Sequence, residues 1–369
     1  MARRPCSIAL TLDDATILCA DKFGDVYSLP LLSNPEEEAA FFNENAPKVY
    51  TPSADITTVH SGRNRKILEE QLKLAGMNQQ PKSKEPMKFK HELLLGHVSM
   101  LTDIVYTTVG SRSYVLTADR DEHVRISRGL PQAHIIEGFC HAHEEFVSRL
   151  CLTKSGLLVS GGGDASLFVW DWQKYRLVER LAIREAAVSY VGPQDEGSFK
   201  VAVSGMWSVP CSEHDEILVA CEGISALFAF KVGAGATHAA GGVVPLGGNA
   251  LGVTFLSTSS PGSCTAVVSV DSVHQAGSTS KVRDGGQRGP RLQLLSYQGE
   301  GQWAEGAPEA EALDWFSRWA PEDSRAAGTR SSEARDGQVL GAADEKALKA
   351  VRDVVYSVEH LRKRPGAED

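Results

Sequence analysis

The sequence predicts an all-β protein built of repeated four-stranded blades, because three stretches break into short apolar runs separated by turn residues. Residues 5–32 give CSIALTL, ATILCA and DVYSLPL, and residues 96–139 give MLTDIVYT, SYVLTA and HVRIS. Residues 143–182 give EFVSRLCLT, GLLVSGG, SLFVWDW and RLVERLAI. Short apolar or alternating runs bounded by Gly, Asp and Ser are typical of β-strands.

The spacing of polar residues within two of these stretches identifies the repeat. A WD repeat has a Gly-His dipeptide before its inner strand, an Asp in a later turn and a terminal Trp-Asp, and it recurs about every 40–45 residues. The third stretch has His143, Ser160, Asp164 and Trp170 at these positions, and the second has His97, Thr117 and Asp121. The two histidines are 46 positions apart. The fold class is therefore a WD40-type β-propeller.

The same residues are expected to form a buried, hydrogen-bonded relay in each repeat. The turn Asp and the strand Ser or Thr would hold the His, while the Trp ring covers it and donates its N–H. Buried polar side chains need such partners, because leaving one unpaired is costly. We assign this structural role to His97, Thr117, Asp121, His143, Ser160, Asp164 and Trp170.

About five blades are readable along the chain, and the first of them is incomplete. Residues 1–32 are predicted to form a partial blade, residues 33–92 a charged insertion, and residues 93–300 the WD-repeat blades. Weaker blades are predicted at 187–232, which begins with the strand-like run AVSYVG, and at 242–297.

Two segments outside the blades have helical patterns. Within the insertion, KILEEQLKLAG fits a helix, although a solvated and partly disordered loop is favoured for the insertion as a whole. Residues 301–369 combine a flexible segment with a C-terminal amphipathic helix. The helix is predicted from the spacing of Leu348, Val351, Val355 and Val358, and we expect it to dock on the propeller or on a partner.

Charge and cysteine content restrict the partners and the compartment. A net charge of −9 argues against broad binding to a phosphate backbone, so a nucleic-acid role needs a local basic patch or a basic partner. The seven cysteines form no CxxC pair and predict neither a zinc site nor a disulfide, which suits the nucleus or the cytosol. Of these two we predict the nucleus. No apolar run reaches the roughly 18 residues that would span a bilayer.

The glycine-rich turns do not predict a cofactor site. SGGGDAS (160–166), GAGATHAAGG (233–242) and DGGQRG (284–289) lie in or between strands, whereas a phosphate-binding turn opens a helix. The HAHEE run at 141–145 has no established zinc-ligand spacing, and no GxSxG elbow is present. We therefore expect no enzyme activity, no bound cofactor and no metal.

Three runs resemble the WD-repeat subunit of the eukaryotic tRNA guanine-N7 methyltransferase. They are LLLGHVSMLTDIVYTTVGSRSYVLTADRDEHVRIS, PQAHIIEGFCHAHEEFVSRLCL and LLVSGGGDASLFVWDW. ADKFGDVYSLPLL at 20–32 resembles the preceding blade of that family, and ADRDE with EFVSR is more specific than the WD pattern itself. The close resemblance covers 20–32 and 93–172, extends loosely to residue 300, and includes the ending VYSVEHLRKR.

The resemblance implies a seven-bladed propeller, of which the first blade is missing from these residues. It implies a heterodimer with a separate Rossmann-fold catalytic subunit that holds S-adenosylmethionine. The pair would form N7-methylguanosine at position 46 of certain tRNAs. The propeller would contribute no catalytic group, but would stabilise the catalytic subunit and help to place the tRNA.

Five partner-binding candidates are carried over from the family. Arg149 matches the basic residue of the family's FVSR segment, which pairs with an acidic residue of the catalytic subunit. The other four, which fall in motif positions near the same surface, are Glu145, Phe146, Lys22 and Arg120. An internal ion pair of Arg149 with Glu144 or Asp119 is the structural alternative, because an unpaired buried charge is costly.

Two other classes of protein remain open. A generic WD-repeat scaffold or adaptor, such as a ubiquitin-ligase adaptor or a chromatin reader, would share the His and Trp-Asp pattern but should lack the ADKFGDV, ADRDE and EFVSR motifs. An RNA-binding protein that acts alone would need a basic face, which the net charge of −9 argues against.

Overall fold

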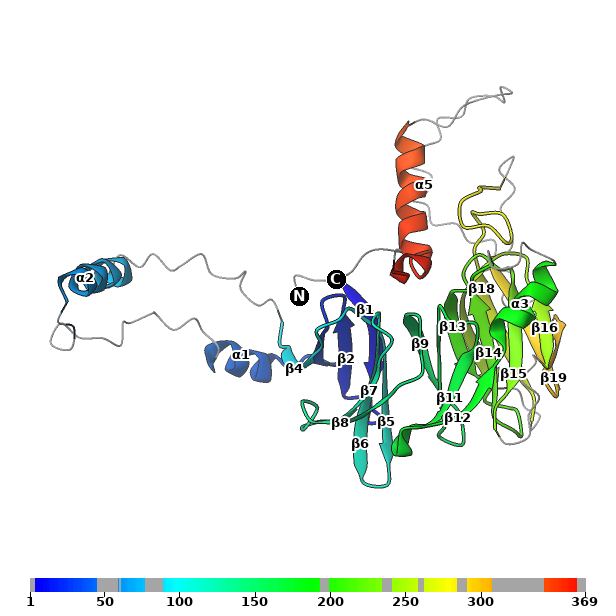
Figure 1. Cartoon of the computed structure of the whole chain (residues 1–369), viewed down its shortest axis with the longest axis horizontal. Coiled ribbons are helices and arrows are strands. Elements are labelled where there is room, and N and C mark those ends of the chain that lie inside the picture. Colours follow the sequence, from blue (N-terminus) through cyan, green and yellow to red (C-terminus); the bar gives the residue numbers. More distant parts are fainter. Residues whose placement is uncertain are drawn as a thin grey trace.

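Five four-stranded antiparallel sheets make up the body of the protein. The structure is a computed structural model that describes residues 4–44, 59, 61–76, 89–192, 199–233, 241–257, 262–283, 291–306 and 342–363. The sheets follow one another side by side in chain order, with the first and the fifth at opposite ends of the row (Figure 1). Each sheet is one blade, as expected of a WD-repeat propeller. The seven blades of the family remain a prediction.

The blades use their strands in simple sequence order. Blade 1 contains β1 (Pro5–Leu10), β2 (Thr16–Asp21), β3 (Asp25–Pro30) and β4 (Glu92–Gly96), and blade 2 contains β5 (Leu101–Val109), β6 (Arg112–Asp119), β7 (Val124–Arg128) and β8 (Ile136–Cys140). Blade 3 contains β9 (Val147–Leu152), β10 (Leu158–Gly162), β11 (Leu167–Asp171) and β12 (Arg176–Leu181). Blade 4 contains β13 (Val203–Ser208), β14 (Glu216–Cys221), β15 (Ala226–Lys231) and β16 (Gly242–Pro245), and blade 5 contains β17 (Ala250–Ser257), β18 (Cys264–Val270), β19 (Leu292–Gly299) and β20 (Gln302–Glu305).

The charged insertion lies within blade 1 rather than after it. Strand β4 pairs with β3, so the blade that the sequence indicated as partial at 1–32 has four strands. The insertion contributes the helices α1 (Pro35–Glu44) and α2 (Gly62–Gly76), and α2 includes the predicted KILEEQLKLAG helix. An ion pair of 3.4 Å between Lys90 and Glu37 joins the two ends of the insertion.

The boundary between blades 3, 4 and 5 differs from the prediction. The run AVSYVG was expected to be a strand, but it lies largely in helix α3 (Ile183–Val191). Ile183, Ala186 and Ala187 are buried, and this helical spacing was obscured in sequence by the β-branched residues that follow it. The fourth strand of blade 4 is instead β16, which was assigned to the last blade.

The C-terminal helix α5 (Ala342–Val355) is shorter than the predicted apolar pattern. It includes Val351 and Val355, whereas Val358 lies beyond its end and is buried. A 3-10 turn, η4 (Glu359–Leu361), follows. Figure 1 shows α5 standing above one end of the blades, with the residues after it lying against them.

The hydrophobic core consists of layers between neighbouring blades. On β6, Val115 packs in the layer between blades 1 and 2, and the next residue, Leu116, packs in the layer between blades 2 and 3. On β10, Leu158 and Val159 divide in the same way between the two sides of blade 3. Successive side chains of a strand point to opposite faces. A blade with a neighbour on each side is therefore apolar on both faces, and this explains the continuous apolar runs in the sequence.

Polar bonds tie the innermost strands of neighbouring blades together. The hydroxyl of Thr102 on β5 donates to the carbonyl of Val147 on β9 over 2.6 Å. The hydroxyl of Ser148 on β9 donates to the carbonyl of Val203 on β13 over 2.5 Å. These side chains satisfy backbone carbonyls that the sheets leave unpaired.

A disulfide joins blade 4 to blade 5, where the sequence predicted none. Cys211 and Cys264 are bonded, with their Cα atoms 5.8 Å apart. The two residues are 53 positions apart in the chain and become neighbours only when the blades stack. Their spacing therefore gave no sign of the bond.

None of the described helices is long and apolar enough to cross a membrane.

Gly162→Ala should destabilise the protein, because the new Cβ would lie 1.7 Å from the carbonyl oxygen of Phe146. The backbone at the start of β9 would have to move, and overpacking of this kind costs about 1–3 kcal/mol. Gly62→Ala is the matched control, because nothing lies within 4 Å of its new Cβ. Urea unfolding would measure the difference. Superimposable curves for the two variants would contradict the close approach of β9 and β10.

Candidate partner-binding rim

One end of the blades gathers most of the residues that the sequence singled out. We call this end the upper rim and define it by the turns that follow the second strand of each blade, at residues 21–24, 119–123, 162–166, 221–224 and 271–274. The loops that lead into the innermost strands meet these turns. In blade 3, for example, the N–H of Gly163 donates to the carbonyl of Phe146 over 3.0 Å.

The relay of blade 3 has every bond that the sequence predicts. Nδ1 of His143 lies 2.7 Å from a carboxylate oxygen of Asp164, and Nε2 lies 2.7 Å from the hydroxyl of Ser160. The indole N–H of Trp170 donates to the same hydroxyl over 2.8 Å. The other oxygen of Asp164 accepts the backbone N–H of Glu144, so the relay also fixes the loop that enters β9. All four relay side chains are buried.

In blade 2 the relay uses Asp119, and the assignment of Asp121 is wrong. Nε2 of His97 lies 2.9 Å from the hydroxyl of Thr117, and its Nδ1 lies 3.7 Å from a carboxylate oxygen of Asp119. Asp119 ends strand β6 and is 3 % exposed, so its carboxylate points into the blade. Asp121 lies two positions further along the turn and forms an ion pair of 3.2 Å with Lys363 instead.

Buried aspartates cap the rim turns by the same geometry in blades 1 and 2. One carboxylate oxygen of Asp119 accepts the N–H groups of Asp121 and His123, and one oxygen of Asp21 accepts those of Phe23 and Asp25. These two turns carry the ADRDE and ADKFGDV motifs. The aspartates that follow alanine in these motifs therefore have a structural role.

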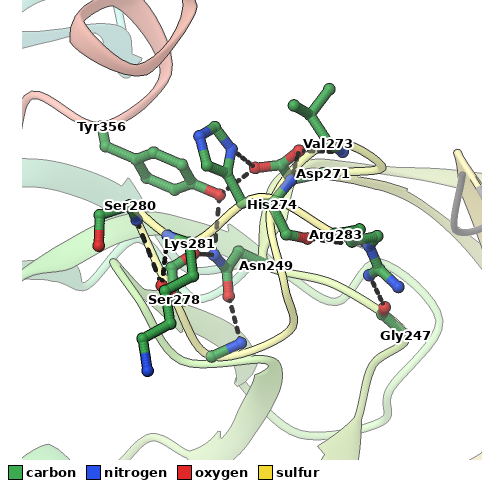
Figure 2. Close-up of polar contacts among 11 residues, drawn as sticks. Gly247, Asn249, Asp271, Val273, His274, Ser278, Ser280, Lys281, Arg283 and Tyr356 are labelled. Carbon is green, nitrogen blue, oxygen red and sulfur yellow. Dashed lines mark hydrogen bonds and ion pairs between the residues drawn. The ribbon is translucent and has the colours of Figure 1, made fainter. Parts of the chain in front are cut away.

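Blade 5 contains a polar cluster that the sequence did not reveal (Figure 2). The carboxylate of Asp271 accepts the N–H groups of Val273 and His274, and its second oxygen lies 2.6 Å from Nδ1 of His274. The hydroxyl of Tyr356 donates to that same oxygen, and the amide of Asn249 donates to the hydroxyl over 2.8 Å. The cluster resembles a WD relay whose last member comes from the C-terminal segment.

Hydrogen bonding determines the charge states in this cluster. Burial alone would raise the pKa of Asp271, but bonds from Tyr356 and from two backbone N–H groups outweigh it and lower the pKa. Burial and the neighbouring carboxylate raise the pKa of Tyr356. The pair is therefore a carboxylate that accepts from a neutral phenol.

The upper rim brings together four of the five partner-binding candidates. Lys22 is exposed in the turn of blade 1, and Arg120 occupies the equivalent position in blade 2, each directly after the capping aspartate. Glu145 and Phe146 lie in the loop that enters β9. Phe146 is only 2 % exposed, so its ring is covered within this chain.

Arg149 lies on β9, among the innermost strands. Its guanidinium donates to the carbonyl of Ser204 on β13 over 2.7 Å and to the carbonyl of Ser148 over 2.9 Å. Neither Glu144 nor Asp119 is its partner among the described residues. Within this chain Arg149 therefore bridges blades 3 and 4.

Asp103 on β5 is the acidic neighbour of Arg149, and sequence reasoning did not single it out. Its carboxylate accepts the hydroxyl of Ser7 over 2.6 Å and the N–H of Leu150 over 2.8 Å. Burial raises the pKa of Asp103, and the positive charge of Arg149 opposes this rise. A polar path therefore crosses the innermost strands of blades 1 to 4. The bonds that cross from one blade to the next join residues 47 or more positions apart, which explains why no local motif revealed the path.

No group of three or more potential metal ligands occurs in the part of the chain that the structure describes. The glycine-rich run 160–166 spans the end of β10 and the turn that leads to β11, where Asp164 belongs to the relay. Most of 233–242 and all of 284–289 lie outside the described residues.

Comparison with known proteins decides the family. The pattern described as "tRNA methyltransferase TRM82 WD40 domain" matches residues 1–295 of the chain. The chain belongs to the TRM82 family. A relative from Phaeosphaeria nodorum, named tRNA (guanine-N(7)-)-methyltransferase non-catalytic subunit TRM82, is 53 % identical over 384 aligned positions, which span 100 % of this chain and 75 % of the relative.

More distant members of the TRM82 family carry the same name. The Aspergillus oryzae protein is 40 % identical over 100 % of this chain and 71 % of its own length. The Vanderwaltozyma polyspora protein is 32 % identical over 51 % of this chain and 31 % of its own length. The family resemblance seen in the ADKFGDV, ADRDE and EFVSR motifs is thereby confirmed.

Asp119→Ala and Asp121→Ala should differ sharply in stability, although the two residues are only two positions apart. Removing Asp119 leaves His97 and two turn N–H groups without their partner, which costs about 1–3 kcal/mol. Removing Asp121 breaks a half-exposed ion pair, which contributes at most about 1 kcal/mol. Thermal melts of both variants would test this. A larger loss for Asp121→Ala would restore the original assignment.

Proposed function

We propose that this chain is the non-catalytic WD-repeat subunit of a tRNA guanine-N7 methyltransferase and forms a heterodimer with the catalytic subunit. The complex would form N7-methylguanosine at position 46 of tRNA. The observation that carries the proposal is the 53 % identity, over the whole chain, to a relative that is named as such a subunit. The same relative's name supports a role without catalysis.

The chemistry of the blades agrees with a role without catalysis. The His, Ser and Asp side chains that could otherwise suggest a nucleophile and a base are bonded to one another as the relay inside blade 3, and His97 is held by Thr117 in blade 2. The hydroxyl of Ser160 faces His143 and Trp170 within the blade, where it is fully buried. A catalytic nucleophile must instead reach its substrate. The methyl donor, S-adenosylmethionine, is accordingly expected on the catalytic subunit.

The upper rim and the adjacent innermost strands are the surface we propose for the catalytic subunit. Lys22 is exposed there, and Arg120 and Glu145 lie on the neighbouring blades. Arg149 would act from inside β9, because its bond to the carbonyl of Ser204 joins blades 3 and 4 beneath the rim. Binding of tRNA by the complex would use basic residues of both subunits, since this chain, with a net charge of −9, is a poor partner for a phosphate backbone on its own. The nucleus is the compartment we expect.

Arg149→Leu should weaken association with the catalytic subunit about tenfold or more, because loss of a hydrogen bond from a charged group, worth about 1.5–3 kcal/mol, removes the bridge between β9 and β13 beneath the proposed interface. Co-expression of the tagged chain with the catalytic subunit, followed by measurement of complex affinity, would test this. Arg128→Leu is the control, because Arg128 is 42 % exposed and pairs with Glu137 on the outer strands of blade 2.

The outcomes distinguish the alternatives. A chain that captures no S-adenosylmethionine-dependent methyltransferase would be a generic WD scaffold, and the proposed function would fail. Capture that is unaffected by Arg149→Leu would leave the function standing and remove Arg149 from the interface. Circular dichroism of both variants would show whether the blades remain folded.

A further inference from the structure

The last described residues of the chain cross the upper rim over four blades. We call residues 356–363 the strap. It follows helix α5 and runs from blade 5, through blades 4 and 3, to blade 2, in the direction opposite to the order of the blades in the chain. In Figure 1 this segment lies at the base of α5, against the blades.

The strap is anchored at its first residue. Tyr356 is 5 % exposed and donates its hydroxyl to Asp271, which is also 5 % exposed. Asn249, 2 % exposed, donates to the same hydroxyl over 2.8 Å (Figure 2). The edge of the phenol ring also meets the His274 ring, with 5.3 Å between the two centroids. The tyrosine is therefore buried against blade 5, which supplies both of its hydrogen-bond partners.

The middle of the strap packs on an apolar patch of blades 3 and 4. Val358 and Leu361 form a cluster with Phe146 and Ala202. The backbone N–H of Val358 donates to the carboxylate of Glu222 over 2.8 Å. The apolar contact of Val358 thus lies beside a backbone bond to the blades, and the 3-10 turn that follows brings Leu361 back to the same patch.

The end of the strap is basic and meets acidic groups. Arg362 lies 3.0 Å from a carboxylate oxygen of Glu145, stacks over the ring of Phe146, and donates to the carbonyl of Val201. Lys363 lies 3.2 Å from Asp121 and 3.1 Å from Glu122. Lys363 donates hydrogen bonds to both carboxylates, and these bonds, with Glu122 the larger contributor, raise the pKa of Lys363.

We infer that the upper rim of blades 2 to 5 is a peptide-binding groove, and that the strap is its intramolecular ligand. The groove would recognise a segment with a tyrosine, two apolar side chains and a final Arg-Lys pair, folded around the 3-10 turn η4. The strap adds no strand to any of the five sheets, each of which has its four strands without it. It is joined to β20 through residues 307–341. It contacts the blades as a bound peptide would, through apolar side chains and through hydrogen bonds from single backbone groups.

The charge pattern supports this assignment of ligand and groove. Arg362 meets the carboxylate of Glu145, and also that of Glu359 within the strap. Lys363 meets the carboxylates of Asp121 and Glu122. Opposite charges across an interface favour binding, so these carboxylates favour a basic ligand and repel an acidic one. A basic peptide is thus the class of ligand that fits.

Docking of the strap also determines which rim residues are exposed to the catalytic subunit, a consequence that rests on the proposed function. The strap covers Phe146, binds Glu145 through Arg362, and accepts the guanidinium N–H of Arg120 at the carbonyl of Leu361 over 2.9 Å. Three of the five candidate partner residues are therefore engaged by the strap. Lys22 is outside its path.

An exchange experiment on the full chain tests the groove without the catalytic subunit, so its failure would not touch the proposed function. A protease site is placed within 307–341, and a dye is attached at Lys349→Cys, an exposed position on α5. After cleavage the labelled C-terminal fragment should remain bound on gel filtration. Excess unlabelled peptide of residues 342–369 should then displace it while circular dichroism of the blades is unchanged.

Peptide variants test the recognition chemistry. Arg362→Glu and Tyr356→Phe peptides should compete about tenfold more weakly or worse, because each removes a bond to a buried or half-buried partner. The Arg352→Glu peptide should compete like the natural sequence, since Arg352 pairs with its neighbour Asp353 on α5. The inference is overturned if the fragment elutes free at once, if excess peptide cannot displace it from folded blades, or if the Arg362→Glu peptide competes equally.

Discussion

The rest of the described structure depends on one interaction, the hydrogen bonds that a buried aspartate carboxylate accepts from backbone N–H groups at the rim. Asp21, Asp119, Asp164 and Asp271 each place a carboxylate where backbone N–H groups of a turn or an entering loop would otherwise be buried unpaired. An unpaired buried group costs about 1–3 kcal/mol. The carboxylates therefore fix the shape of the upper rim. They thereby also fix the positions of the candidate partner-binding residues and of the residues that contact the strap.

The same interaction explains why a chain rich in His, Ser and Asp is a scaffold. In blades 2 and 3 the histidines are held between the aspartate and a hydroxyl, so their nitrogens are already used. In blade 5 the aspartate holds His274 and also accepts from Tyr356, which lies 85 positions further along the chain. The carboxylate that stabilises the rim turn of blade 5 thereby also anchors the strap to the blades.

Local spacing predicted most of the fold, because a blade is made of neighbours in sequence. The relay of His143, Ser160 and Asp164 spans 21 positions and could be read directly. Blade 2 shows the limit, since Asp119 and Asp121 are equivalent by residue type and only burial distinguishes them. Features that join distant segments were missed, among them strand β4 behind its insertion, the Cys211–Cys264 bond, and the bridge from Asp103 to Leu150. No sequence periodicity links such pairs, because stacking of the blades brings them together.

Reconstitution of tRNA methylation tests the central claim most directly. The catalytic subunit and this chain would be purified separately, and N7-methylguanosine would be quantified in tRNA by mass spectrometry for each alone and for the mixture. The account predicts no product from this chain alone and a large gain in product when it is added to the catalytic subunit. Methylation by this chain alone, or a catalytic subunit that is indifferent to its presence, would contradict the account.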